Sequence, residues 1–131
     1  MTVTAKQEAI IATAEQIYAI VSNCNRFGAF IPEQIKGWKS TEDNCQFTVE
    51  GIATMEVSIV EKIPFYKVKF QVSNDKNIPM ELEIIIENQS DTREIEIFMR
   101  ADVPIFLQPL VKKPMQNLVD VMAARIGTMD Y

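Results

Sequence analysis

Residues 106–126 read FLQPLVKKPMQNLVDVMAARI, and this stretch decides which fold the chain can adopt. Its apolar residues recur at helical spacing and predict one long amphipathic helix with a single apolar stripe. Pro109 is expected in the first turn, where no amide hydrogen bond is lost. Pro114 lies further in and is expected to kink the helix. The stripe consists of Phe106, Leu107, Leu110, Val111, Met115, Leu118, Val119, Met122 and Ile126.

The bend expected at Pro114 has two interpretations. It separates a lid-like first part of the helix from a packed second part, or it fits the helix to a curved sheet. Gly127 is the expected end of the helix.

The residues before this helix alternate between apolar and polar over several short runs, which is typical of strands with one buried face. Folding the chain about its polar loops predicts an antiparallel meander in which apolar residues pair across strands. The turn at 43–44 places Trp38 opposite Val49 and Ser40 opposite Phe47. The loop before Phe65 places Ile59 opposite Val68 and Val57 opposite Phe70. The loop at 89–92 places Ile86 opposite Ile95, Ile84 opposite Ile97 and Leu82 opposite Met99.

The N-terminal part predicts an edge strand over 4–11, followed by a short helix. Thr13 and Gln16 have the spacing of a capping box, in which each side chain bonds the other residue's backbone amide. An aromatic-rich stretch from Phe27 to Pro32 then predicts a second short helix or turn.

Together these elements predict a single α+β domain over residues 1–131. Six to seven antiparallel strands form a curved sheet, two short helices follow the first strand, and the C-terminal helix covers the apolar face, because such a face must be buried. The outward-facing glutamates are interpreted as a solvated surface.

The composition excludes several functions. A net charge of −5 argues against nucleic acid as a partner. The chain has no histidine, so histidine-dependent nucleophilic catalysis is excluded, and neither a metal site nor a cofactor is expected. No apolar run is long enough to span a membrane. With no visible secretory signal, Cys24 and Cys45 predict reduced thiols in a cytoplasmic protein.

Three stretches carry a family resemblance: IIATAEQIYAIVSNCNRFGAFIP (10–32), CQFTVEGIATMEVSIVEKIP (45–64) and KKPMQNLVDVMAARI (112–126). With the order of elements, they resemble the helix-grip fold of the START and polyketide-cyclase-like (SRPBCC) superfamily, which includes the birch-pollen-allergen family. The resemblance spans essentially the whole chain, and it rests on topology and spacing.

The resemblance implies a cavity between sheet and helix that binds an apolar small molecule such as a lipid, sterol or polyketide. Glu61, Arg93 and Gln116 are the candidates for polar contacts with such a ligand, although long side chains near element ends also reach water. The implied cavity wall consists of Phe27, Phe30, Trp38, Phe47, Met55, Val57, Phe70, Leu82, Ile84, Ile97, Met99, Met115, Leu118 and Met122.

Three functions remain open at this point. The first is a non-catalytic carrier or sensor of a small hydrophobic ligand, favoured by the apolar inner face. The second is a cyclase or dehydratase that uses Glu61, Tyr18 or Tyr66 as acid or base. The third is an interaction module with a filled cavity, whose apolar surface would lie at 65–66 or 103–106. A homodimer suits either a carrier or an interaction module.

Overall fold

The structure is a computed structural model that describes residues 1–29, 35–51 and 53–131. The strands are β1 (Thr2–Ile10), β2 (Ile35–Ser40), β3 (Asn44–Val49), β4 (Ala53–Ile63), β5 (Lys67–Asn74), β6 (Met80–Asn88) and β7 (Arg93–Ala101). The helices are α1 (Ala14–Val21) and α2 (Gln108–Thr128), with short 3-10 helices η1 (Cys24–Ala29) and η2 (Ile105–Leu107).

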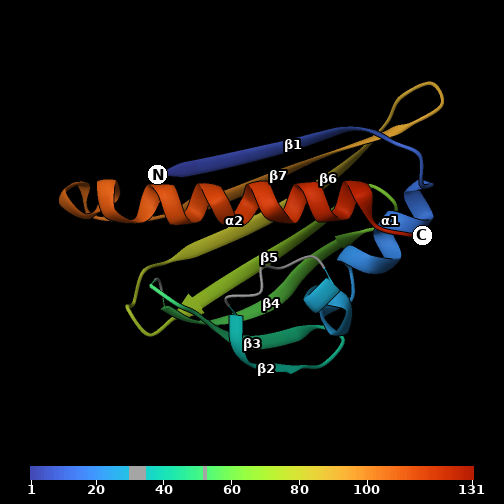
Figure 1. The fold of residues 1–131 in the computed structure, drawn as a ribbon. Helices are drawn as coiled ribbons and strands as arrows, with labels where there is room; N and C mark the ends of the chain where they lie inside the picture. The colour runs from blue at the N-terminus through green and yellow to red at the C-terminus, as the bar shows by residue number, and fades with distance from the viewer. Residues whose placement is uncertain (30–34, 52) are drawn as a thin grey trace.

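In the described part of the chain the strands form one antiparallel sheet of seven, in the order β1-β7-β6-β5-β4-β3-β2. The first strand therefore lies at one edge, as the sequence predicts, and it pairs with the last strand. Helix α2 lies along the face of the sheet over β1 and β7, and α1 lies at one end of the molecule (Figure 1). This arrangement confirms the predicted helix-grip fold, with its curved antiparallel sheet and long C-terminal helix.

The pairing of β6 with β7 confirms the predicted register, with Ile84 opposite Ile97 and Leu82 opposite Met99. The predicted register between β4 and β5 is wrong by two residues, because Ile59 pairs with Phe70. A bulge between Ile59 and Glu61 inserts an extra residue into β4. The shift of two residues keeps the side chains up to Ile59 on their predicted face, since the side-chain period of a strand is two, whereas the bulge reverses the face of Glu61.

The predicted register between β2 and β3 is also wrong, since Val49 pairs with Ile35 instead of Trp38. The pairing shifts between Lys36 and Lys39. Gly37 lies within this irregularity with a φ of 66°, which a residue with a side chain rarely adopts. Trp38 nevertheless stacks on the ring of Phe47, with centroids 5.5 Å apart.

Helix α1 begins with the predicted capping box. The Thr13 hydroxyl accepts a hydrogen bond from the Gln16 amide at 3.1 Å, and the Gln16 side chain accepts one from the Thr13 amide at 2.8 Å. The helix then buries Ile17, Ile20 and Val21 against the core.

Helix α2 carries Pro109 in its first turn, as predicted, and continues through Pro114 without a break. Its buried residues begin at Met115, directly after this proline. The helix ends at Thr128, so Gly127 lies inside it and does not end it. A Cβ at Gly127 would overlap Cγ of Gln7 and lie 2.9 Å from its Cδ, so this glycine allows α2 to approach β1.

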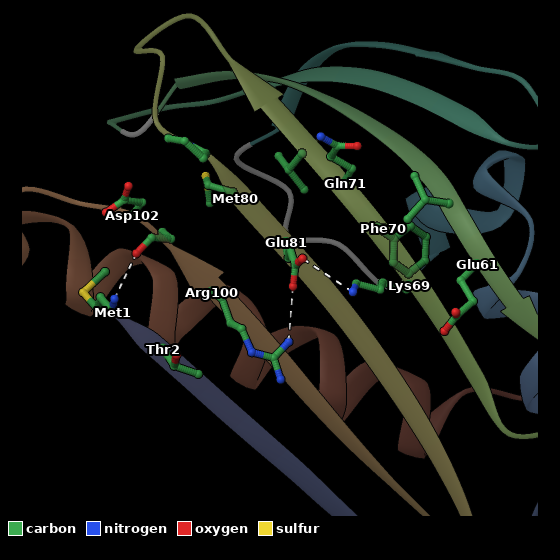
Figure 2. A pocket seen from close by; sticks show the side chains of 14 residues that line it. Met1, Thr2, Glu61, Lys69, Phe70, Gln71, Met80, Glu81, Arg100 and Asp102 are labelled. Atoms are coloured by element: carbon green, nitrogen blue, oxygen red, sulfur yellow. Dashed lines mark hydrogen bonds and ion pairs between the residues drawn. The ribbon is translucent and has the colours of Figure 1, made fainter.

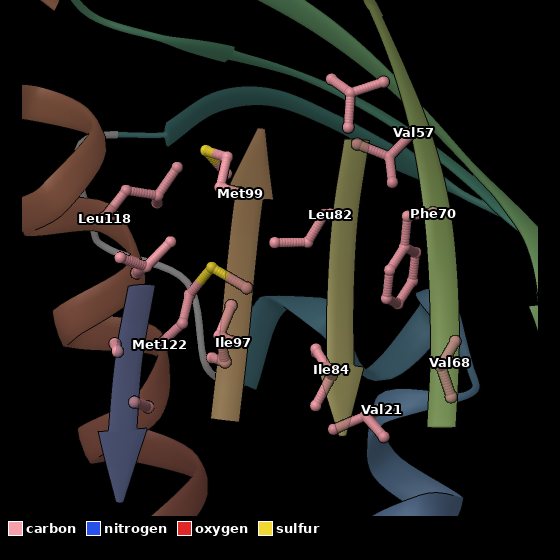
Figure 3. Packing of buried hydrophobic residues seen from close by; sticks show 14 of the residues in the cluster. Val21, Val57, Val68, Phe70, Leu82, Ile84, Ile97, Met99, Leu118 and Met122 are labelled. Atoms are coloured by element: carbon pink, nitrogen blue, oxygen red, sulfur yellow. The ribbon is translucent and has the colours of Figure 1, made fainter. Parts of the chain in front are cut away.

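The core lies between the sheet and α2. Leu118 and Met122 of the helix point toward Leu82, Ile97 and Met99 of the sheet (Figure 3). All five side chains are buried. Burial of one such side chain stabilises the fold by about 1.5–3 kcal/mol, so this layer is a major contribution to stability.

Candidate functional site

A small cavity lies inside this core, between the sheet and α2. Its volume is about 20 Å³, which is close to the space of one water molecule. Every residue that lines it is apolar. The lining residues are Phe47, Met55, Val57, Val72, Met80, Leu82, Met99, Leu118 and Met122, from β3 to β7 and from α2.

Most of this wall coincides with residues that the sequence singles out. Phe47, Met55, Val57, Leu82, Met99, Leu118 and Met122 belong both to the predicted wall and to the cavity lining. Val72 and Met80 also line the cavity but were not predicted. The sequence does contain their signal, since each alternates in phase with predicted neighbours on its strand.

The remaining predicted wall residues lie elsewhere. Phe70, Ile84, Ile97 and Met115 are buried in the same core but do not line the cavity. Trp38 is half-buried on β2 against Phe47. The backbone of Phe27 lies in η1, whereas Phe30 and the side chain of Phe27 lie outside the described residues.

Methionines dominate the lining. Met55, Met80, Met99 and Met122 surround a cavity of about 20 Å³. Pockets that hold drug-sized ligands measure roughly 300–1,000 Å³, so this cavity is closed around almost no free space. Unbranched methionine side chains change rotamer readily and adapt to irregular shapes. The lining is therefore built from side chains that can reshape the cavity.

None of the three residues expected to make polar contacts with a ligand lines this cavity. Glu61 is exposed and lies 3.1 Å from the Lys67 ammonium. Strand alternation from Val57 would place Glu61 on the inner face, but the bulge after Ile59 turns it outward.

Arg93 and Gln116 bond to backbone distant in the sequence. Nε of Arg93 donates to the Ala12 carbonyl at 3.1 Å, and Nε2 of Gln116 donates to the Thr4 carbonyl at 2.8 Å. Arg93 therefore ties β7 to the segment that leads into α1, and Gln116 ties α2 to β1.

The two tyrosines considered as acid or base also lie away from the cavity. Tyr18 is half-buried on α1 and meets the Phe65 ring edge-on, with centroids 5.7 Å apart. Tyr66 is exposed at the turn between β4 and β5. Neither tyrosine belongs to the wall formed by Phe47 and the methionines.

A larger hollow of about 730 Å³ lies on the opposite, outer face of the sheet. Charged side chains line it, as Figure 2 shows. Glu81 lies 3.5 Å from the Lys69 ammonium and 3.6 Å from the Arg100 guanidinium. These groups are partly exposed, so their pairing adds little to stability. The hollow agrees with the sequence interpretation of the glutamates as a solvated face.

Cys24 and Cys45 are free thiols, and both are buried. The Cys45 thiol donates a hydrogen bond to the Cys24 sulfur, which lowers the pKa of Cys24. The same hydrogen bond, together with burial, raises the pKa of Cys45. The contact joins η1 to β3, and the Cys24 amide also donates to the Glu42 carbonyl at 2.7 Å.

Among the described residues, no group of three or more Cys, Asp and Glu side chains is close enough to hold a metal ion. In the same part of the chain, no helix is both long and apolar enough to cross a bilayer.

The comparisons with known proteins match the fold and not the sequence. No family model and no curated protein matches the chain. A START superfamily protein from Mycobacterium smegmatis matches with a TM-score of 0.68 and 15% identity, over 99% of this chain and 98% of that one. Protein CV1439 from Chromobacterium violaceum matches with a TM-score of 0.72 and 12% identity, over 98% and 96%. A solution structure of the Aha1 dimer from Colwellia psychrerythraea matches at 0.62 and 12%, over 100% and 99%.

At these identities the likeness defines a fold. The chain has the helix-grip fold of START-like proteins, as its resemblance to that superfamily implied.

Proposed function

We propose that the chain binds a small hydrophobic molecule between the sheet and α2. The observation that carries the proposal is the wholly apolar, methionine-rich lining of the inner cavity. A ligand there would gain from burial of apolar surface, at about 25 cal/mol for each Å² removed from water. The fold that the chain shares with a START superfamily protein supports a ligand-binding role.

Binding requires the cavity to enlarge. At about 20 Å³ it holds no lipid or polyketide, so the free protein is a closed state. The four lining methionines supply an adaptable surface against which a ligand can pack. Ligand affinity is then reduced by the fraction of molecules that occupy the open state.

The proposal assigns binding, and not catalysis, to this cavity. A cyclase or dehydratase needs an acid or base within hydrogen-bond reach of its substrate. The residues that line the described cavity offer neither, and Glu61 and Tyr66 lie at the surface.

The proposal is tested by filling the cavity. Val57 and Val72 line it and are buried, so Val57→Ile with Val72→Ile adds two methyl groups to the free space. We expect this variant to bind the fluorescent apolar probe N-phenylnaphthylamine at least tenfold more weakly, since tenfold equals about 1.4 kcal/mol. Unfolding in urea should show a cooperative transition with a loss of stability of about 1–3 kcal/mol, the usual cost of added core volume, which separates loss of space from loss of fold.

Val60→Ile is the matched control. Val60 lies on the same strand, is 55% exposed and lines the outer hollow. It should leave probe binding unchanged. Two results would contradict the proposal, because each would place the probe outside the inner cavity. One is equal probe binding by the wild type and the Val57→Ile, Val72→Ile variant. The other is a loss of probe binding caused by Val60→Ile alone.

A further inference from the structure

The segment that leads into α2 exposes large apolar side chains. Ile105 is 84% exposed, Phe106 is 78% exposed and Leu110 is 72% exposed. No residue of η2 is buried, and α2 buries none before Met115. Figure 1 shows the start of α2 projecting past the start of β1. We call residues 105–113 the projecting end.

The projecting end is held in place. Nε2 of Gln108 donates to the Val103 carbonyl at 3.1 Å, and the Leu107 amide donates to the Pro104 carbonyl at 2.9 Å. Leu107 and Val111 are half-buried against the core. The exposed side chains are therefore presented by ordered helix.

Basic residues follow the apolar ones on the same surface. Phe106, Leu110 and Lys113 are spaced by four and three residues, which places them on one helix face. Lys112 is also exposed. The sequence from Val103 to Val119 contains no acidic residue, although the chain carries a net charge of −5. The projecting end is thus a basic and apolar region on an acidic molecule.

The spacing along the helix axis suits a lipid surface. Seven residues separate Phe106 from Lys113, which corresponds to about 10 Å at 1.5 Å per residue. If the projecting end enters end-on, this axial distance matches the roughly 5–10 Å by which apolar side chains are buried at a bilayer interface. With Ile105, Phe106 and Leu110 at that depth, the flexible lysine side chains reach the phosphate layer.

We infer that the projecting end docks the protein reversibly on an anionic lipid bilayer. Charge decides between the candidate occupants. In a symmetric contact between two copies, Lys112 and Lys113 of one projecting end would face the same lysines of the other and repel them. Anionic lipid headgroups instead complement these lysines, and no acidic residue between Val103 and Val119 opposes them. The inference goes beyond the proposed function and does not depend on it, because the docking residues do not line the inner cavity.

Flotation with lipid vesicles tests the inference. The protein of residues 1–131 should bind vesicles that contain phosphatidylglycerol and bind phosphatidylcholine vesicles weakly, with binding that falls as salt rises. The double variant Phe106→Ser, Leu110→Ser should bind at least tenfold more weakly. Lys112→Gln and Lys113→Gln should each lower binding about fivefold, on phosphatidylglycerol vesicles only.

Two further variants keep the test sharp. Ile11→Ser removes a side chain that is 86% exposed just after β1 and should leave vesicle binding unchanged. Because Trp38 also emits, Phe106→Trp is compared with the wild type. The added emission should be blue-shifted on vesicles and quenched by brominated lipid, which reports insertion of residue 106.

Equal binding by the wild type and the Phe106, Leu110 double variant would overturn the inference. A second result would also overturn the inference: the protein does not bind vesicles, and light scattering shows a dimer that the Phe106, Leu110 double variant abolishes. This surface would then be an interface between copies.

Discussion

Tyr131 packs partly into the core beside the end of α2, and its hydroxyl donates a hydrogen bond to the Ile126 carbonyl at 2.8 Å. Burial raises the pKa of this phenol from 10.0 to about 12. The folded state therefore holds the proton more tightly than the unfolded state. The stabilisation is complete below pH 10 and is lost as pH rises through 12.

This linkage predicts a fall in stability at alkaline pH that depends on one hydroxyl. After allowance for water at the half-exposed ring, the free energy of unfolding should fall by about 1–2 kcal/mol between pH 10 and pH 12 because of Tyr131. Tyr131→Phe should lose about 1 kcal/mol at neutral pH with the hydrogen bond, and should show a smaller alkaline fall. Urea unfolding of both proteins across this range measures the difference, and parallel curves would contradict the assignment.

Single residues were predictable from sequence where their partners are local. Thr13 and Gln16 lie three residues apart, so their capping box could be predicted. Arg93 and Gln116 bond to backbone 81 and 112 residues away, and no sequence pattern carries that information. Glu61 was misplaced because a bulge, which sequence alternation does not show, reverses its face.

At the scale of elements, the contact between α2 and β1 depends on Gly127. A methyl group on this residue would overlap Cγ of the Gln7 side chain and lie 2.9 Å from its Cδ. In an exposed helix, replacement of glycine by alanine stabilises by about 1 kcal/mol. Here the close approach of the strand reverses that sign.

Gly127→Ala should therefore destabilise the fold by about 1–3 kcal/mol, the usual cost of overpacking. Gln7→Ala removes the Cγ and Cδ atoms that the new methyl group meets. The double variant should recover most of the loss, so the coupling energy should be favourable by more than about 1 kcal/mol. Thermal unfolding of the four proteins in the cycle measures this coupling, and additive effects would show that Gly127 does not contact Gln7.

The sequence predicts the strands and helices better than it predicts the registers between paired strands. The β6–β7 register was predictable because a short polar loop joins two regular alternating runs. The β2–β3 and β4–β5 registers were not, because bulges near Gly37 and Val60 depend on backbone conformations that apolar patterning does not encode. The same limit applies to Gly127. The sequence predicts that it ends the helix, whereas in the structure it lies inside α2 against the Gln7 side chain.

At the scale of the whole molecule, the sequence predicts an apolar sheet face covered by a helix, and the structure agrees. It does not predict how much space remains between the two layers, since that depends on how individual side chains interdigitate. The lid hypothesis for the first part of α2 loses its basis here. Helix α2 continues through Pro114, and the cavity beneath it measures only about 20 Å³.

Pro114 nevertheless divides α2 into two parts that differ in burial. Residues before it are exposed or half-buried, and the buried stripe begins at Met115. The proposed docking surface and the proposed ligand-binding cavity therefore lie on different sides of Pro114, and each proposal can fail without the other.

The central claim is that a hydrophobic ligand enters the inner cavity, and methionine-methyl NMR tests it most directly. In protein labelled with ¹³C at the methionine methyls, saturation with N-phenylnaphthylamine should shift Met55, Met80, Met99 and Met122, which line the cavity. Met115, buried outside the cavity lining, is the internal control and should move less. A probe that binds in fluorescence yet leaves all four cavity methyls unshifted would contradict the account.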